Sequence, residues 1–187
     1  MSRTRSLTVI TTVALAGTLL TACGADATPS AAVSSPPAVA QAAASTSLPA
    51  TEVAALRYMR EEEKLARDVY TVLAETSGDQ RFTRIASSEQ QHMDRVKGLL
   101  DRYAITDPAA GMGPGEFRNA DLQRLYTKLV ARGRTSATAA LAVGRTIERT
   151  DIADLDERLD DVTTTSVRRV FTHLRRASKN HLRAFSG

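Results

Sequence analysis

The chain has 187 residues, a formal net charge of +4, 42% hydrophobic residues, 4% aromatic residues and no tryptophan. Because acidic residues are interleaved with the basic ones and aromatic side chains are scarce, it lacks the single-sign stripe and the stacking surface of nucleic-acid-binding proteins. Its one cysteine, Cys23, excludes an intramolecular disulfide.

Residues 1–22 have the pattern of a secretory signal peptide. Two arginines precede an apolar run at residues 7–20, which is too short to span a membrane comfortably. The run ends in Leu20-Thr21-Ala22-Cys23, which resembles the lipobox of bacterial lipoproteins, and the resemblance implies that Cys23 is acylated. We therefore expect membrane lipid as a partner and a location on the extracytoplasmic side of the bacterial cell envelope.

Residues 23–50 predict a disordered tether. The segment consists mainly of Ala, Ser, Pro, Thr and Val with almost no charge, and it contains Pro36-Pro37. Such a composition cannot bury enough apolar surface to offset its chain entropy. An extended spacer is therefore expected between the acylated cysteine and the domain.

Residues 51–187 have the size of one domain, and their apolar residues recur at helical spacing. The pattern predicts an all-α domain with helices at about residues 52–75, 82–104, 121–131, 136–159 and 166–185. Gly78, Pro108 and Gly133 stand where three of these helices should stop. No alternating strand pattern is present.

Short turns join the first helix to the second and the fourth to the fifth, so each pair should lie antiparallel. Between the pairs, a connection of about thirty residues carries the short third helix. One long crossover between two helical hairpins is the connectivity of a ferritin-like four-helix bundle. This bundle is our expected fold class. A homodimer is left open.

The second helix carries two polar residues on its apolar stripe. At about 3.6 residues per turn, Glu89 and His92 fall between Ile85 and Val96 on the core-facing side. Buried polar groups must be satisfied by partners. Either the two side chains hydrogen-bond to each other or to the backbone, or they point at one metal ion.

Other helices interrupt their apolar stripes in a similar way. On the first helix, Glu62 and Glu63 flank the apolar face, while the projection points Glu61 to solvent. Glu148 lies on the stripe of the fourth helix with Asp151 one turn further. His181 stands near the centre of the apolar face of the last helix.

Several sequence strings resemble known families. Glu63, Ala66 and Tyr70 follow the first-helix motif of rubrerythrin-type ferritin-like proteins, and Glu89-x-x-His92 follows the second-helix motif. The strings YMREEEKLARDVY, SEQQHMD, LLDRY, LQRLYTKLV and NHLRAF resemble a bacterial family known as domain of unknown function 2202, which belongs to the ferritin-like group. The resemblance covers about residues 54–185.

This resemblance implies a site for one or two iron or manganese ions. Its implied ligands are Glu63, Glu89, His92, Glu148 and His181, with Glu62 and Asp151 as alternates. Tyr70 would lie nearby as an electron or proton donor. The last helix departs from the pattern, because Ser178 stands where a Glu-x-x-His motif would place a bridging carboxylate, and Asp151 is the residue that could supply the missing oxygen.

Three functions remain open at this point. The first is a non-haem iron or manganese protein that reacts with dioxygen or peroxide, and the second is a metal-binding or sensing module without turnover. The third is a structural envelope domain whose polar cluster is satisfied by hydrogen bonds.

Six basic residues also share a face of the last helix, which we expect to be solvated, with contact to anionic lipid headgroups as the second interpretation.

Overall fold

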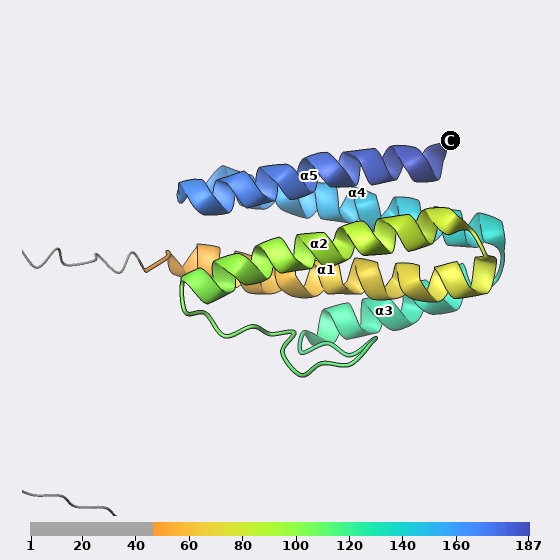
Figure 1. Ribbon diagram of the computed structural model, residues 1–187, viewed down its shortest axis with the longest axis horizontal. Helices are drawn as coiled ribbons and strands as arrows, with labels where there is room; N and C mark the ends of the chain where they lie inside the picture. The colour runs from red at the N-terminus through yellow and green to blue at the C-terminus, as the bar shows by residue number, and fades with distance from the viewer. Residues whose placement is uncertain (1–46) are drawn as a thin grey trace, which may run out of the picture. The chain divides into compact units, whose positions relative to one another are not determined.

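The computed structural model describes residues 47–187, and over this range it contains five helices and no strand. The helices are α1 (Ala50–Ser77), α2 (Gln80–Arg102), α3 (Ala120–Gly133), α4 (Ala137–Asp161) and α5 (Thr165–Ser186) (Figure 1). The prediction of an all-helical domain is therefore confirmed. The predicted signal peptide, Cys23 and nearly all of the predicted tether lie outside the described residues.

A tight turn folds α1 and α2 into an antiparallel hairpin (Figure 1). Gly78 follows α1 with φ of 68°, a left-handed conformation that favours glycine, and its N–H donates to Ala74 O. The Asp79 carboxylate then caps α2 by accepting from the N–H of Arg81 at 2.9 Å. These local signals explain why the reversal occurs here.

The second hairpin, α4 and α5, is fastened to the start of α1. Glu52 is 1% exposed, and its Oε1 accepts hydrogen bonds from the N–H of Thr163 at 2.8 Å and of Thr164 at 3.0 Å. The Thr163 hydroxyl donates to the same oxygen at 2.8 Å. One carboxylate thus satisfies donors at the turn before α5, which helps to hold the two hairpins together.

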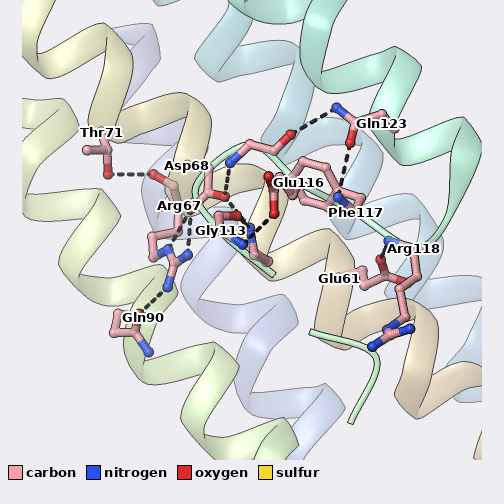
Figure 2. A network of polar contacts seen from close by, with 12 residues as sticks. Glu61, Arg67, Asp68, Thr71, Gln90, Gly113, Glu116, Phe117, Arg118 and Gln123 are labelled. Carbon is pink, nitrogen blue, oxygen red and sulfur yellow. Dashed lines mark hydrogen bonds and ion pairs between the residues drawn. The ribbon is translucent and has the colours of Figure 1, made fainter. Parts of the chain in front are cut away.

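The crossover between α2 and α4 carries α3 and packs on α1 (Figures 1 and 2). Lys64 Nζ donates to Asp68 Oδ2 at 2.6 Å and to Gly113 O at 2.7 Å, while the N–H of Gly115 donates to the same Asp68 oxygen at 2.9 Å. At Gly133 a β-carbon would lie 2.6 Å from Leu73 Cδ2. The close approach of α3 to α1 therefore depends on that glycine.

The crossover also overturns one prediction, because Glu61 does not point to solvent. It is 5% exposed, and its Oε1 accepts a hydrogen bond from the N–H of Arg118 at 2.6 Å (Figure 2). The same oxygen accepts from the N–H of Asn119 at 3.1 Å. The helical projection placed Glu61 outside the face that the other long helices cover. It could not show that the crossover covers this second face of α1.

Two apolar clusters form the core. The first contains, among others, Leu65, Val69, Tyr70, Phe82, Ile85, Ile147 and Phe185. The second contains Met59, Val96, Leu100, Leu155, Phe171 and Leu174. Each of the four long helices contributes to both clusters, and between its two contributions each carries buried or half-buried polar residues. A polar layer therefore separates the two halves of the core.

Among residues 47–187, no helix combines the length and the apolar character that crossing a membrane requires.

Candidate metal centre

The polar layer draws side chains from all four long helices. Its buried members are Glu62 and Glu63 of α1, Glu89 and His92 of α2, Glu148 and Asp151 of α4, and Ser178 of α5. His181 of α5 completes it with a side chain that is 11% exposed. A spacing of three residues brings the pairs of α2, α4 and α5 to one side of their helices, whereas Glu62 and Glu63 are neighbours in α1. The five carboxyl groups and two imidazoles therefore share one depth of the core.

Glu89 lies between the two histidines. Its Oε2 is 2.7 Å from His92 Nδ1, and its Oε1 is 2.9 Å from His181 Nδ1. The two imidazole rings stack with their centroids 5.5 Å apart. One carboxylate of α2 is thus in contact with an imidazole on each side.

Each histidine also faces a second carboxylate. His92 Nδ1 is 3.1 Å from Glu63 Oε2, and His181 Nδ1 is 3.6 Å from Glu148 Oε2. The structure therefore forms two groups of potential ligand atoms, each within 4.8 Å of one another: Glu63, Glu89 and His92, and Glu89, Glu148 and His181. All five principal residues predicted from the sequence come together, with Glu89 common to both groups.

The alternates Glu62 and Asp151 are buried in the same layer but belong to neither group. Asp151 interacts with Ser178, the residue that replaces the expected carboxylate of α5, and Ser178 Oγ donates to Leu174 O at 3.0 Å. Glu62 instead interacts with Asp154. Asp151 is therefore the better placed of the two to provide an oxygen near the position of the missing carboxylate.

Burial raises the pKa of most of these carboxyl groups. The pKa of Glu148 rises to about 8 because the group is buried and faces the charge of Glu89, and burial raises that of Asp151 to about 7. Burial, followed by the charge of Asp151, raises the pKa of Glu62 and of Glu63 well above the ordinary value. Burial therefore disfavours the charged forms of these carboxyl groups.

Glu89 and the histidines shift in the opposite sense. Burial alone would raise the pKa of Glu89, but the contacts with His181 and His92 outweigh it and lower the pKa to about 2. Burial would likewise lower the pKa of both imidazoles, yet the facing carboxylates raise it to about 11 for His92 and about 10 for His181. These contacts therefore favour the charged forms of Glu89 and of both imidazoles.

Three buried carboxyl oxygens of this layer lack a hydrogen-bond partner: Glu62 Oε2, Glu63 Oε1 and Asp151 Oδ1. In addition, His92 Nδ1 faces two carboxylates although a ring nitrogen carries at most one proton. Unsatisfied buried polar atoms cost free energy. The donor set therefore suits a cation, which could contact several of these atoms at once.

Two neighbours orient the site. The Tyr70 side chain is fully buried, and its hydroxyl donates to Glu148 Oε1 at 2.7 Å, which leaves Oε2 on the side of His181. His181 Nε2 lies 3.0 Å from Ser88 Oγ, so a proton on Nε2 would leave Nδ1 free to act as a ligand.

Tyr70 was expected near the site from the sequence, whereas Ser88 and His173 were not. The His173 ring lies edge-on to His92 with centroids 6.2 Å apart. Ser88 directly precedes Glu89 and lies beside the apolar stripe of α2, and this position could have identified it as a neighbour of the site. His173 is exposed, and no feature of the α5 pattern marks it.

Comparison with known proteins gives relatives without an assigned activity. The family described as an uncharacterized protein domain (DUF2202) matches residues 52–187. Uncharacterized protein MJ0754 of Methanocaldococcus jannaschii is 48% identical over 127 residues, which are 68% of this chain and 69% of that protein. The crystal structure of hypothetical protein MJ0754 from Methanococcus jannaschii has 46% identity and a TM-score of 0.73, over 74% of this chain and 79% of that chain.

Proposed function

We propose that this chain, which belongs to the DUF2202 family of uncharacterized protein domains, is a ferritin-like metal-binding protein whose ligands lie in the polar layer of the four long helices. The observation that carries the proposal is the position of Glu89, with each carboxylate oxygen within 3 Å of a different histidine. A carboxylate from one helix that serves two groups of potential ligands is typical of dinuclear carboxylate sites in helical bundles.

The donor set fits a hard or borderline divalent ion. Carboxylate oxygens suit manganese, and imidazole nitrogens together with carboxylates suit iron. Glu63, Glu89 and His92 would hold one ion, and Glu89, Glu148 and His181 would hold a second. When bound, iron or manganese would supply redox chemistry with dioxygen or peroxide.

The residues of the chain itself prepare the site in three ways. The apolar clusters on both sides of the layer exclude water. Burial, followed by the charge of Glu148, raises the pKa of the Tyr70 hydroxyl well above its ordinary value. The hydroxyl therefore keeps its proton and donates it in the hydrogen bond to Glu148. Ser88 fixes the orientation of the His181 ring. These contacts favour a preorganised site over one assembled by the ion.

A second function, metal binding or sensing without turnover, is favoured by Ser178. This residue is 1% exposed and offers a hydroxyl where a second bridging carboxylate would complete a symmetric dinuclear site. A structural role in the envelope would remain if no metal binds.

The test is metal binding by the purified full chain. We expect one or two equivalents of iron(II) or manganese(II) per chain by elemental analysis and by titration calorimetry. Glu89→Gln should lower both occupancy and affinity, because it removes a charged oxygen from both groups. Glu75→Gln, at an exposed residue near the end of α1, is the matched control.

Two outcomes separate the candidate functions. Consumption of dioxygen or peroxide by the iron-loaded protein would support the redox function, and its absence from a metal-loaded protein would support the module without turnover. Wild-type protein that binds no divalent ion, although its circular dichroism shows a folded domain, would eliminate both metal functions.

We also propose, from the sequence pattern alone, that lipid on Cys23 tethers the domain to the extracytoplasmic face of the membrane. A closed storage shell suits such a tether poorly, since every subunit would carry an anchor.

A further inference from the structure

The outer face of α5 carries positive charge without acidic residues. Between Thr165 and Ser186 the helix has no Asp or Glu, and its basic residues are Arg168, Arg169, Arg175, Arg176, Lys179 and Arg183. All are exposed except Arg175, which is half-buried. By contrast, the other long helices mix both signs of charge.

This face contains a groove of about 420 Å³. We call it the α5 basic groove, and it is lined by Thr172, Arg175, Arg176, Lys179, Asn180 and Arg183. Four of the six residues are cationic, and the other two carry a hydroxyl and an amide. No carboxylate lines the groove, so its electrostatic potential favours an anion.

Contacts on α5 and α4 hold two of the cationic side chains in place. Arg175 Nη1 donates to Asp156 Oδ1 at 2.6 Å, and Arg183 Nη2 donates to Asn180 Oδ1. Within residues 47–187, Arg176 and Lys179 form no ion pair and no side-chain hydrogen bond. Their donors are therefore available to a ligand between two anchored arginines.

A smaller hollow of about 130 Å³ adjoins the groove on α5. It is lined by His173, Arg176, Ala177 and Asn180, so it shares Arg176 and Asn180 with the groove. Arg176 is the one basic residue common to both hollows.

The donors match the chemistry of phosphate. A guanidinium offers two parallel N–H groups to a pair of phosphate oxygens, and an ammonium adds a compact charge. We propose that the α5 basic groove binds a phosphate group, either as free phosphate or as the headgroup of an anionic phospholipid. The proposal does not depend on metal in the polar layer.

The first test measures free phosphate by titration calorimetry on the full chain. The double variant Arg176→Gln/Lys179→Gln should weaken inorganic phosphate binding by at least about tenfold, since it removes charge-assisted hydrogen bonds. Arg132→Gln/Lys128→Gln on α3 is the matched control, because both residues are exposed and the same charges are removed. It should bind phosphate as the wild type does.

The second test measures binding to anionic phospholipid headgroups. It uses the full chain with Cys23→Ser, so that no lipid anchor contributes. We compare co-sedimentation with phosphatidylglycerol and phosphatidylcholine vesicles, and the readout is the excess bound to phosphatidylglycerol. The groove variant should lose this excess and the α3 control should keep it. Added salt should reduce it, because the Debye length falls from about 10 Å at 0.1 M to about 3 Å at 1 M.

Phosphate binding that depends on the groove would identify free phosphate as a ligand, and a vesicle effect alone would identify the lipid headgroup. Either result supports the proposal. The proposal is overturned if neither phosphate nor phosphatidylglycerol vesicles bind, or if the groove variant and the α3 control lose binding equally.

Discussion

The Tyr70 hydroxyl donates a hydrogen bond of 2.7 Å to Glu148 Oε1, across 78 residues of sequence. The bond joins α1 to α4 at the edge of the polar layer, and both partners are almost completely buried. It also determines which Glu148 oxygen remains for His181. This single contact therefore links the stability of the core to the arrangement of the candidate ligands.

We expect Tyr70→Phe to lower the free energy of unfolding by about 1–3 kcal/mol, because Glu148 Oε1 would be left buried without that donor. Metal affinity should also fall, since the Glu148 carboxylate would be free to rotate. Urea unfolding and metal titration measure the two effects. Tyr126→Phe serves as the control, and an equal loss in both variants would contradict this role for the Tyr70 hydroxyl.

The stability of the metal-free domain should fall as the pH rises from 6.5 to 8. Folded Glu148 titrates at about 8 and the imidazoles at about 10 to 11, against ordinary values of 4.5 and 6.5. The folded state therefore binds more protons than the unfolded chain in this range, and each extra proton lowers stability by about 1.4 kcal/mol per pH unit.

Urea unfolding of chelator-treated protein across this range would measure the fall. Bound metal should oppose this loss of stability, because the ion binds the deprotonated ligands and the affinity of the site for the ion therefore rises with pH. We therefore expect proton release on manganese(II) binding, detectable by calorimetry in buffers of different ionisation enthalpy. A metal-free domain whose stability rises with pH would contradict the charge states inferred for the polar layer.

Metal should raise the thermal midpoint of the wild type, and His92→Ala and His181→Ala should abolish most of that rise. A ligand that binds only the folded state stabilises it by about 2.7 kcal/mol at a hundredfold excess over Kd. Differential scanning fluorimetry with and without manganese(II) or iron(II) measures the shift. His173→Ala is the matched control, and an equal loss there would count against the two assigned imidazoles.

Ser178→Glu should increase the number of ions bound or the metal-dependent rise in Tm. The substitution restores Glu-x-x-His on α5 and adds a carboxylate beside Asp151, while it lowers the stability of the metal-free protein through repulsion and burial. Ser178→Gln has similar size without the charge and should not increase metal binding. The same stoichiometry in all three proteins would contradict the idea of a reduced dinuclear site.

Cys23→Ser should release the protein from membranes or leave an unprocessed precursor. One acyl chain holds a protein only marginally, whereas several chains hold it stably. Fractionation of cells with immunoblotting measures the distribution, with Ser30→Ala as a control in the tether. A fully processed Cys23→Ser protein that stays in the membrane fraction would show that the lipobox interpretation is wrong.

The amino-acid sequence by itself determined the helices and the polar residues on their inner faces. Helical periodicity is a local property, so the stripe that contains Ile85, Glu89, His92 and Val96 could be identified without knowledge of the partners. Local stop signals such as Gly78 were equally readable. For the same reason, the depth of His181 in α5 was predictable from its own helix.

Only the tertiary structure decided which of these residues meet and which faces are covered. Glu89 meets His181, in addition to His92 on its own helix, because α2 packs against α5, and the sequence of α2 alone does not specify that neighbour. Glu61 is buried because the crossover returns over α1. Contacts between residues distant in sequence depend on helix packing and on the path of the loop, and periodicity within one helix carries no information about either.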